Sequence, residues 1–127
     1  MSIRNKALQW YESKYGRRDT PIYTSKYYQP EESWPKKNVW WPQIPVKAIK
    51  NKDTHYIHLL CQVAPNKNNF HHLKVPTKFL IEHLKKFHTL GEQISLYLSA
   101  DPETLFLEER GEGTLNFSVF LVNTAVS

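Results

Sequence analysis

The chain has 127 residues, a formal net charge of +5 and a single cysteine, Cys61, and 40% of its residues are hydrophobic. This length and composition are those of a soluble globular protein, so we expect a single domain over residues 1–127 rather than a repeat, low-complexity or disulfide-built fold. The apolar runs are far shorter than the ~20 residues of a membrane span, which excludes a transmembrane helix. The N-terminus does not resemble a signal peptide. The lone cysteine favours a reducing, cytoplasmic location.

The charge is divided unevenly along the chain. Residues 1–88 hold 16 Lys and Arg against 6 Asp and Glu, whereas residues 89–127 hold one Arg against 6 acidic residues. If the two parts occupy different surfaces of the fold, one surface attracts a polyanion. If they intermix in space, the asymmetry disappears, and the sequence leaves both outcomes open.

The first predicted element is an amphipathic helix over residues 1–15. Apolar side chains recur at mostly three- and four-residue intervals from Ile3 to Tyr15, with Ser2 placed to cap the helix and Gly16 to end it. Such a stripe predicts a helix that packs onto the body of the domain.

Residues 16–45 form a different kind of segment, because five prolines interrupt them. They predict a long extended arm in which aromatic and basic residues alternate. This mixture is typical of single-stranded nucleic-acid platforms, where cations contact phosphates and rings stack on bases at ~1–3 kcal/mol each. The alternative is that the rings hold the arm against the core, since a long coil needs large side chains to offset its ordering entropy. The predicted nucleic-acid-binding residues are Arg17, Arg18, Lys26, Tyr27, Tyr28, Trp34, Lys36, Lys37, Trp40 and, from the following 66–69 loop, Lys67.

A β-hairpin and a helix are predicted in the middle of the chain. Residues 54–63 are apolar on both faces, as in a central strand, and residues 70–75 return antiparallel after a polar loop. A helix over residues 76–90 follows, marked by a proline in its first turn and an apolar stripe. Residues 46–49 fit either a short strand or one helical turn.

Short strands are predicted after this helix, over residues 92–100, 105–107 and 115–121, although the last segment also fits one face of a helix. The elements together predict an α+β fold. In this fold an antiparallel sheet or open barrel of about five strands, formed by residues 46–127, is packed by one central helix and an N-terminal helix.

The histidines and the cysteine form no motif with a specific chemistry. His55 and His58 are three apart on a predicted strand and therefore point to opposite faces, and the adjacent His71 and His72 do the same. We therefore expect no metal and no cofactor. Cys61 is expected to be a small buried residue rather than a nucleophile, because free cysteine is among the most buried residue types.

One short unit of the chain resembles a known family. The strand that ends at Val75 and Pro76, followed by Phe79 in a helix, resembles the corresponding strand–helix unit of B3-type DNA-binding barrels. Such barrels have more strands than this sequence supplies. The resemblance implies DNA binding and adds slightly to the hypothesis of a nucleic-acid partner.

Three functional hypotheses follow. The leading one is non-catalytic binding of nucleic acid, or of a nucleoprotein assembly, by the arm and the 66–69 loop. The alternative is a protein-interaction accessory subunit or homo-oligomer without nucleic acid, which uses the arm and the acidic last third of the chain. A further alternative is a small metal-independent nuclease, in which two histidines and a lysine face one groove. The candidates for that groove are His58, His71, His72 and Lys74.

Overall fold

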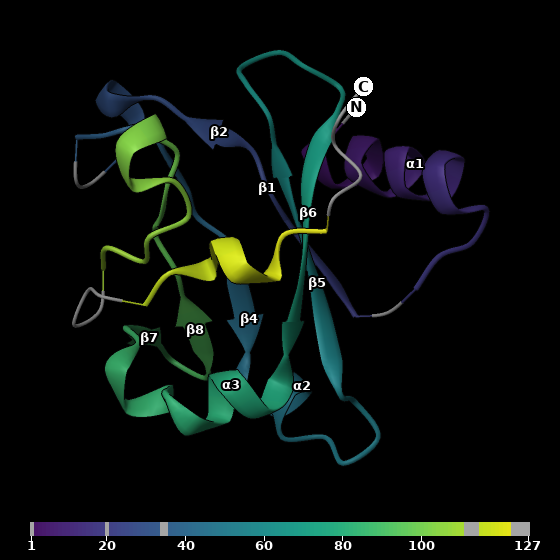
Figure 1. The fold of residues 1–127 in the computed structure, drawn as a ribbon, viewed down its shortest axis with the longest axis vertical. Coiled ribbons are helices and arrows are strands. Elements are labelled where there is room, and N and C mark those ends of the chain that lie inside the picture. The colour runs from purple at the N-terminus through teal and green to yellow at the C-terminus, as the bar shows by residue number, and fades with distance from the viewer. Residues whose placement is uncertain (1, 20, 34–35, 111–114, 123–127) are drawn as a thin grey trace.

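A long β-hairpin runs through the middle of the protein (Figure 1). Its strands are β5 (Tyr56–Gln62) and β6 (Phe70–Pro76), and β1 (Ile22–Ser25) pairs with β5 in parallel to give a sheet in the order β1-β5-β6. The computed structural model describes residues 2–19, 21–33, 36–110 and 115–122, which form a small single-domain α+β fold. The predicted fold class is therefore confirmed, as is the predicted hairpin.

The central strand β5 is buried on both faces, as its sequence predicts. Ile57, Leu59 and Cys61 contribute to the main hydrophobic cluster, and all three are 0% exposed. Leu60 points the other way, into a smaller cluster beneath the N-terminal helix. Both clusters therefore depend on this one strand, and burial of such side chains contributes roughly 1.5–3 kcal/mol each.

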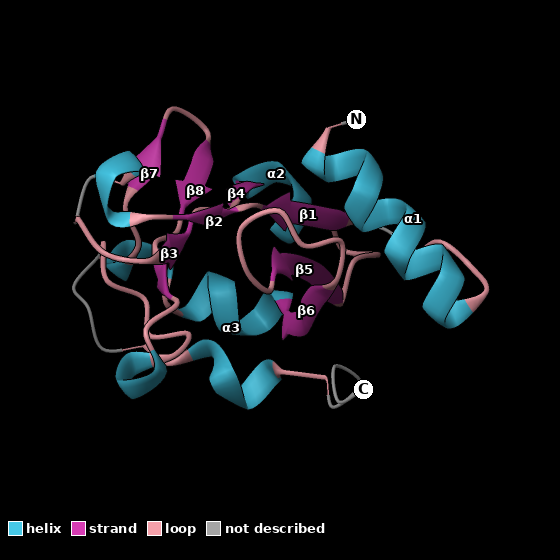
Figure 2. Cartoon of the chain, turned by 90° about the horizontal axis from the view of Figure 1, so that it is seen from above, coloured by secondary structure: helices cyan, strands magenta, loops and turns pink. Residues whose placement is uncertain are grey.

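The N-terminal helix α1 (Ile3–Tyr15) begins and ends where the sequence predicts. The Ser2 hydroxyl accepts a hydrogen bond from the Asn5 amide, and the Gly16 amide donates to the Glu12 carbonyl with glycine in a left-handed conformation at φ 71°. Buried residues of α1 pack on β1, β5 and β6. Figure 2 shows α1 and α3 (Thr77–Glu82) on opposite sides of this sheet.

The segment of residues 16–45 is built into the sheets, so it is not a separate arm. Besides β1 it supplies three short strands, each of two or three residues. Two further three-stranded sheets use them, in the orders β2-β3-β9 and β4-β8-β7. The strands of these sheets are β2 (Tyr27–Tyr28), β3 (Val39–Trp40), β4 (Gln43–Pro45), β7 (Thr89–Leu90), β8 (Gln93–Ser95) and β9 (Leu98–Ser99). The predicted single sheet or barrel of about five strands is thus not confirmed.

Of the two helical segments after β4, the first matches one of the two predicted alternatives and the second is shorter than predicted. Residues 46–49 form one helical turn, α2 (Val46–Ile49). The predicted 76–90 helix ends at Glu82, where α3 gives way to a 3₁₀ turn. Near the C-terminus, Phe117–Phe120 is a 3₁₀ turn, so the helical alternative describes this segment better than a strand. Two other 3₁₀ turns are Pro30–Glu32 and Pro102–Thr104.

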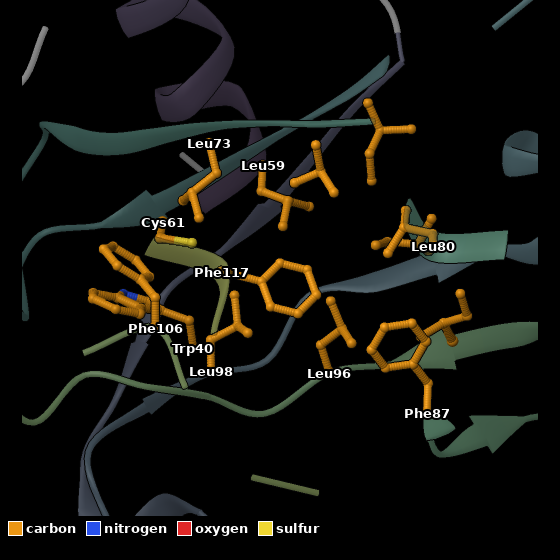
Figure 3. Close-up of a cluster of buried hydrophobic side chains, with 14 of the residues drawn as sticks. Trp40, Leu59, Cys61, Leu73, Leu80, Phe87, Leu96, Leu98, Phe106 and Phe117 are labelled. Atoms are coloured by element: carbon orange, nitrogen blue, oxygen red, sulfur yellow. The ribbon is translucent and has the colours of Figure 1, made fainter. Parts of the chain in front are cut away.

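The main cluster fills the space between the hairpin and the two smaller sheets (Figure 3). Phe117 projects into its middle, and the rings of Trp40 and Phe106 stack with their centroids 4.9 Å apart. The Trp40 indole N–H donates to the Gln62 carbonyl at 2.7 Å, so its polar atom is satisfied in the interior. Trp40 therefore joins the C-terminal part of the chain to the hairpin.

None of the helices in the described ranges has the length and apolar character that crossing a membrane requires.

Candidate functional site

The register of the hairpin brings three polar side chains onto one face. His58 lies directly opposite Lys74, and His72 lies opposite Leu60, two pairs further along. Because side chains alternate between the faces of a strand, His58, His72 and Lys74 all project toward α1. Lys74 also lies over the ring of Tyr56, with its Nζ 4.5 Å from the ring centroid.

The two histidines belong to a hydrogen-bonded chain. His58 Nδ1 lies 2.9 Å from His72 Nε2, and His72 Nδ1 lies 2.8 Å from the Tyr15 hydroxyl. Each bond needs one proton, so the tautomers are linked. When Tyr15 donates to His72 Nδ1, His72 donates from Nε2, and His58 carries its own proton on Nε2. The chain thus links the end of α1 to a nitrogen of His58.

The last turn of α1 covers one part of this face and leaves the next part open. Tyr11 and Tyr15 are one helical turn apart, and the Tyr11 ring packs edge-on against both His58 and His72, at centroid distances of 5.8 and 5.3 Å. Beyond Gly16 the helix stops, and the sheet face opens into a pocket of about 450 Å³. Its lining residues are Tyr11, Tyr15, Arg17, Asp19, Asp53, Thr54, His55, Tyr56, His58, His72, Lys74 and Val122.

Both histidines of the chain are buried at the back of the pocket, with 8% of His58 and 3% of His72 exposed. Burial lowers the pKa of His72 to about 4, with the neighbouring His58 adding to the effect, and burial likewise lowers the pKa of His58. Each ring is therefore neutral at pH 7, which is the state that exchanges a proton through hydrogen bonds of this kind.

The outer nitrogen of His58 faces the pocket. Its Nδ1 is used by His72, and within the described part of the chain no group is hydrogen-bonded to Nε2. The fully buried polar atoms left without a partner there are His71 Nδ1 and His88 Nε2, and His58 Nε2 is not among them. His58 therefore presents one ring nitrogen to whatever enters the pocket.

A carboxylate at the rim is held by two donors. The Tyr11 hydroxyl donates to Asp19, and Arg17 Nε lies 3.1 Å from the same carboxylate. The hydrogen bond from Tyr11 is the main cause of the lowered pKa of Asp19, so this carboxyl stays ionised. The pair fixes the position of Arg17 at the entrance.

A second hollow adjoins the first, because Thr54 and His55 line both. It lies between α2 and α3 and carries Lys50, Lys52 and Lys78. Lys78 approaches Glu82 at 4.0 Å, while Lys50 and Lys52 belong to no ion pair within the described residues. The two hollows form one continuous surface around His55.

Most cations of the residues predicted to bind nucleic acid are paired with acids. Arg17 contacts Asp19 at 3.1 Å, Arg18 contacts Glu12 at 2.7 Å, Lys26 contacts Glu32 at 2.6 Å and Lys37 contacts Glu109 at 2.6 Å. Lys36 and Lys67 are exposed without such a pair in the described ranges. These six residues come from several sides of the fold, and Arg17 is the one that lines the histidine pocket.

The predicted stacking rings are largely occupied inside the fold. Trp40 is 1% exposed and stacked on Phe106, so its faces are covered. Tyr27 is half-buried against the edge of Trp40, and Tyr28 is half-buried beside Trp41. Trp34 lies outside the described residues.

Other potentially reactive groups do not join the pocket. Cys61 is buried in the core, and burial raises the pKa of its thiol. His71 projects to the core face, where its ring packs edge-on against Trp40 and Phe106. Within the described ranges, no group of three or more His, Cys, Asp or Glu side chains is arranged to hold a metal ion.

Part of this site was predicted from the sequence. The sequence named His58, His72 and Lys74 as candidates for one groove, but it could not separate His72 from His71. It also treated His55 and His58 as opposed, whereas His55 precedes the first residue of β5 and lines the same pocket. Tyr11, Tyr15 and Asp19 were missed; the signal for the tyrosines was their spacing of four residues on the covered face of a helix.

No family model, no curated protein and no solved structure matches the chain, so its function is inferred from the geometry of the pocket.

Proposed function

We propose that the protein binds nucleic acid through its phosphate backbone, at the surface formed by the two adjoining hollows. We call this the histidine–lysine surface; its residues are Arg17, Lys50, Lys52, His58, Lys74 and Lys78. The observation that carries the proposal is the pocket of about 450 Å³ into which His58, Lys74 and Arg17 all project.

The chemistry of these groups suits a phosphate. Lysine and arginine bind phosphate oxygens by charge-assisted hydrogen bonds, and a neutral histidine donates one more bond from Nε2. Lys50, Lys52 and Lys74 have no acidic partner within the described chain, so they are available to replace the counterions of a polyanion. Asp19 is already satisfied by Tyr11 and Arg17, which reduces its repulsion of an incoming anion.

A base-stacking ring is available on the same surface. Tyr56 is 44% exposed and lies beside Lys74, which holds its ammonium over the ring. A base that stacks on Tyr56 would place its own phosphate near Lys74, and such stacking contributes ~1–3 kcal/mol per base. Tyr56 thus takes the role that the sequence assigned to the tryptophans.

In this proposal the histidine–lysine surface binds the nucleic acid, in place of most of the predicted binding residues of the 16–45 segment. A phosphate that approached Arg18, Lys26 or Lys37 would first have to displace Glu12, Glu32 or Glu109. Ion pairs of this kind are individually weak, yet together they cancel the positive charge that a polyanion needs. Arg17 is common to the sequence hypothesis and to the histidine–lysine surface, but it is paired with Asp19 in the same way, so the charge of that surface rests on Lys50, Lys52 and Lys74. The lone, buried Cys61 agrees with a cytoplasmic setting for this function.

The test is a titration of fluorescein-labelled single-stranded and duplex DNA and RNA, followed by anisotropy between roughly 50 and 200 mM salt. Each phosphate contact contributes about 0.7 to 0.9 to the slope of log K against log salt. We expect the double variant Lys50→Gln with Lys74→Gln to lower this slope by about 1 to 2. The matched double variant Lys36→Gln with Lys67→Gln removes the same charge elsewhere and leaves the slope unchanged.

Two results would contradict the proposal. One is binding that ignores salt over this range, and the other is a loss of slope in the Lys36 and Lys67 variant alone. If no oligonucleotide binds and the measured solution mass is that of a dimer, the protein-interaction hypothesis takes its place. Val119, at 75% exposed, and Leu121, at 38%, would then be the first residues to test at an interface.

A further inference from the structure

We infer that the Tyr15–His72–His58 chain makes the histidine–lysine surface a site that cleaves RNA by internal transesterification. The inference rests on the proposed function, since it requires a phosphodiester in the same pocket. It goes further in assigning an activity, a substrate with a 2′-hydroxyl group, and separate roles to named side chains.

The geometry around His58 is that of an oriented general base. A catalytic base needs one nitrogen directed at the substrate and a second group that fixes its ring and tautomer. His58 Nε2 faces the pocket, while His72 holds Nδ1 at 2.9 Å and is itself held by Tyr15 at 2.8 Å. The outer nitrogen lies at a pocket whose charged lining is Arg17 and Lys74 together with Asp19 and Asp53.

Lys74 is placed to act on the reacting phosphate. It is the residue directly opposite His58 in the antiparallel register. Side chains opposed in this way have Cβ atoms about 4.5–5.5 Å apart, so an ammonium and an imidazole can contact neighbouring oxygens of one phosphodiester. The ammonium would stabilise the extra negative charge that develops on the phosphorane.

The step balances without water or a further reactant. In the reactive tautomer of the chain, His58 donates from Nδ1 to His72 Nε2 and His72 donates from Nδ1 to the Tyr15 oxygen, so His58 Nε2 has a free lone pair. The RNA 2′-hydroxyl gives its proton to this Nε2, and its oxygen forms a bond to the adjacent phosphorus. The bond from phosphorus to the 5′ oxygen breaks, and that oxygen takes a proton from His55, which lines the same pocket. The products are a 2′,3′-cyclic phosphate and a 5′-hydroxyl. His58 then releases its proton to solvent, and His55 regains one.

This scheme divides the residues by role. His58, His55 and Lys74 touch the substrate and are the catalytic residues. His72 and Tyr15 are positioning residues, because they act on the substrate only through His58. DNA lacks the 2′-hydroxyl, so the same surface would bind DNA without cutting it.

The experiment uses an end-labelled RNA oligonucleotide and its 2′-deoxy counterpart, with EDTA present, and separates the products on a denaturing gel. We expect the wild-type protein to bind both and to cut only the RNA, leaving 2′,3′-cyclic phosphate ends. His58→Gln should slow cleavage by about 10²- to 10⁴-fold, the usual contribution of a general base. His71→Leu is the matched control, since His71 lies on the other face of the hairpin, in β6, and this variant should cleave at the wild-type rate.

A second variant and a pH profile test the inference even if His58→Gln does not fold. Lys74 is exposed, so Lys74→Gln should fold normally and still lose cleavage. Tyr15→Phe removes the oxygen that accepts from His72 Nδ1 when the histidine pair is protonated, which disfavours protonation of the pair, so the acidic limb of kcat/KM should move to lower pH. An unchanged limb would contradict the positioning role.

The outcomes separate the two proposals. RNA that binds in a salt-dependent manner but is not cut overturns the inference and leaves the proposed function intact. Cleavage by His58→Gln at the wild-type rate also overturns the inference. Failure to bind RNA or DNA at all overturns both.

Discussion

His72 Nε2 lies 2.9 Å from His58 Nδ1, across the hairpin and beneath the last turn of α1. The neighbouring His71 points to the opposite face, where its Nδ1 is buried without a partner in the described chain. Two adjacent histidines of one strand thus have different roles. One is part of a hydrogen-bonded chain at a pocket, and the other is part of the aromatic core.

Stability should fall as the pH drops below neutral. In the unfolded chain the pKa of His72 returns to about 6.5, whereas in the folded protein it is about 4. Between these values the unfolded chain binds a proton that the folded chain does not, so the free energy of unfolding decreases with falling pH. The contribution of His72 is present in full above pH 6.5, and its loss is worth up to about 3 kcal/mol.

Urea unfolding at several pH values between 7.5 and 4.5 would measure this loss. The lowered pKa values of His58 and His71 act in the same direction. The variant His72→Gln should give a flatter curve than the wild type. Identical curves for the two proteins would show that His72 is not the group that titrates.

The Tyr15 hydroxyl should stabilise the protein through His72. The variant Tyr15→Phe keeps the ring, which packs against Tyr11 and His72, but leaves His72 Nδ1 without this hydrogen bond in a residue that is 3% exposed. An unpaired buried polar atom costs about 1–3 kcal/mol. Chemical denaturation at pH 7.5 would show it, and a variant as stable as wild type would mean that the bond is not formed in solution.

Trp40 should matter for folding and not for nucleic-acid binding. Trp40→Phe keeps an aromatic ring on Phe106 but leaves the Gln62 carbonyl without its indole donor, a cost of about 1–3 kcal/mol. We expect a lower melting temperature with unchanged affinity for oligonucleotides at a temperature where the variant is folded. Weaker binding by the folded variant would indicate that Trp40 stacks on a base.

Gly16 should be hard to replace. Its φ of 71° lies in the left-handed region, although a Cβ at this position would meet no atom within 4 Å. The cost of Gly16→Ala is therefore conformational, roughly 1 kcal/mol, and not steric. Because Tyr15 precedes this cap, the variant should also weaken the Tyr15 to His72 bond. A melting temperature equal to that of wild type would contradict this view of the helix end.

The elements with long periodic patterns were the predictable ones. Helix α1 and the β5–β6 hairpin each repeat their apolar pattern over seven or more residues, so period and caps identified them. The strands of residues 27–45 have two or three residues each, too short to show a period. Their prolines also indicated an irregular segment, since proline usually interrupts a sheet.

The site was less predictable than the fold, because it depends on register and on contacts distant in sequence. Alternation shows that His71 and His72 face opposite ways, but only the pairing with β5 shows which of them meets His58. The acidic partner of Lys37 is Glu109, 72 positions away, so no local pattern could show that this cation is neutralised.

Chemical shifts of the histidine ring nitrogens, followed as a short RNA with 2′-deoxy substitution at every position is added, test the central claim most directly. The substitution prevents cleavage while it preserves every phosphate. We predict that the ring signals of His58 and His55 move with saturation and that those of His83 and His88, outside the pocket, do not. Saturable binding that leaves the signals of His58 and His55 unmoved would contradict the histidine–lysine surface as the phosphate site.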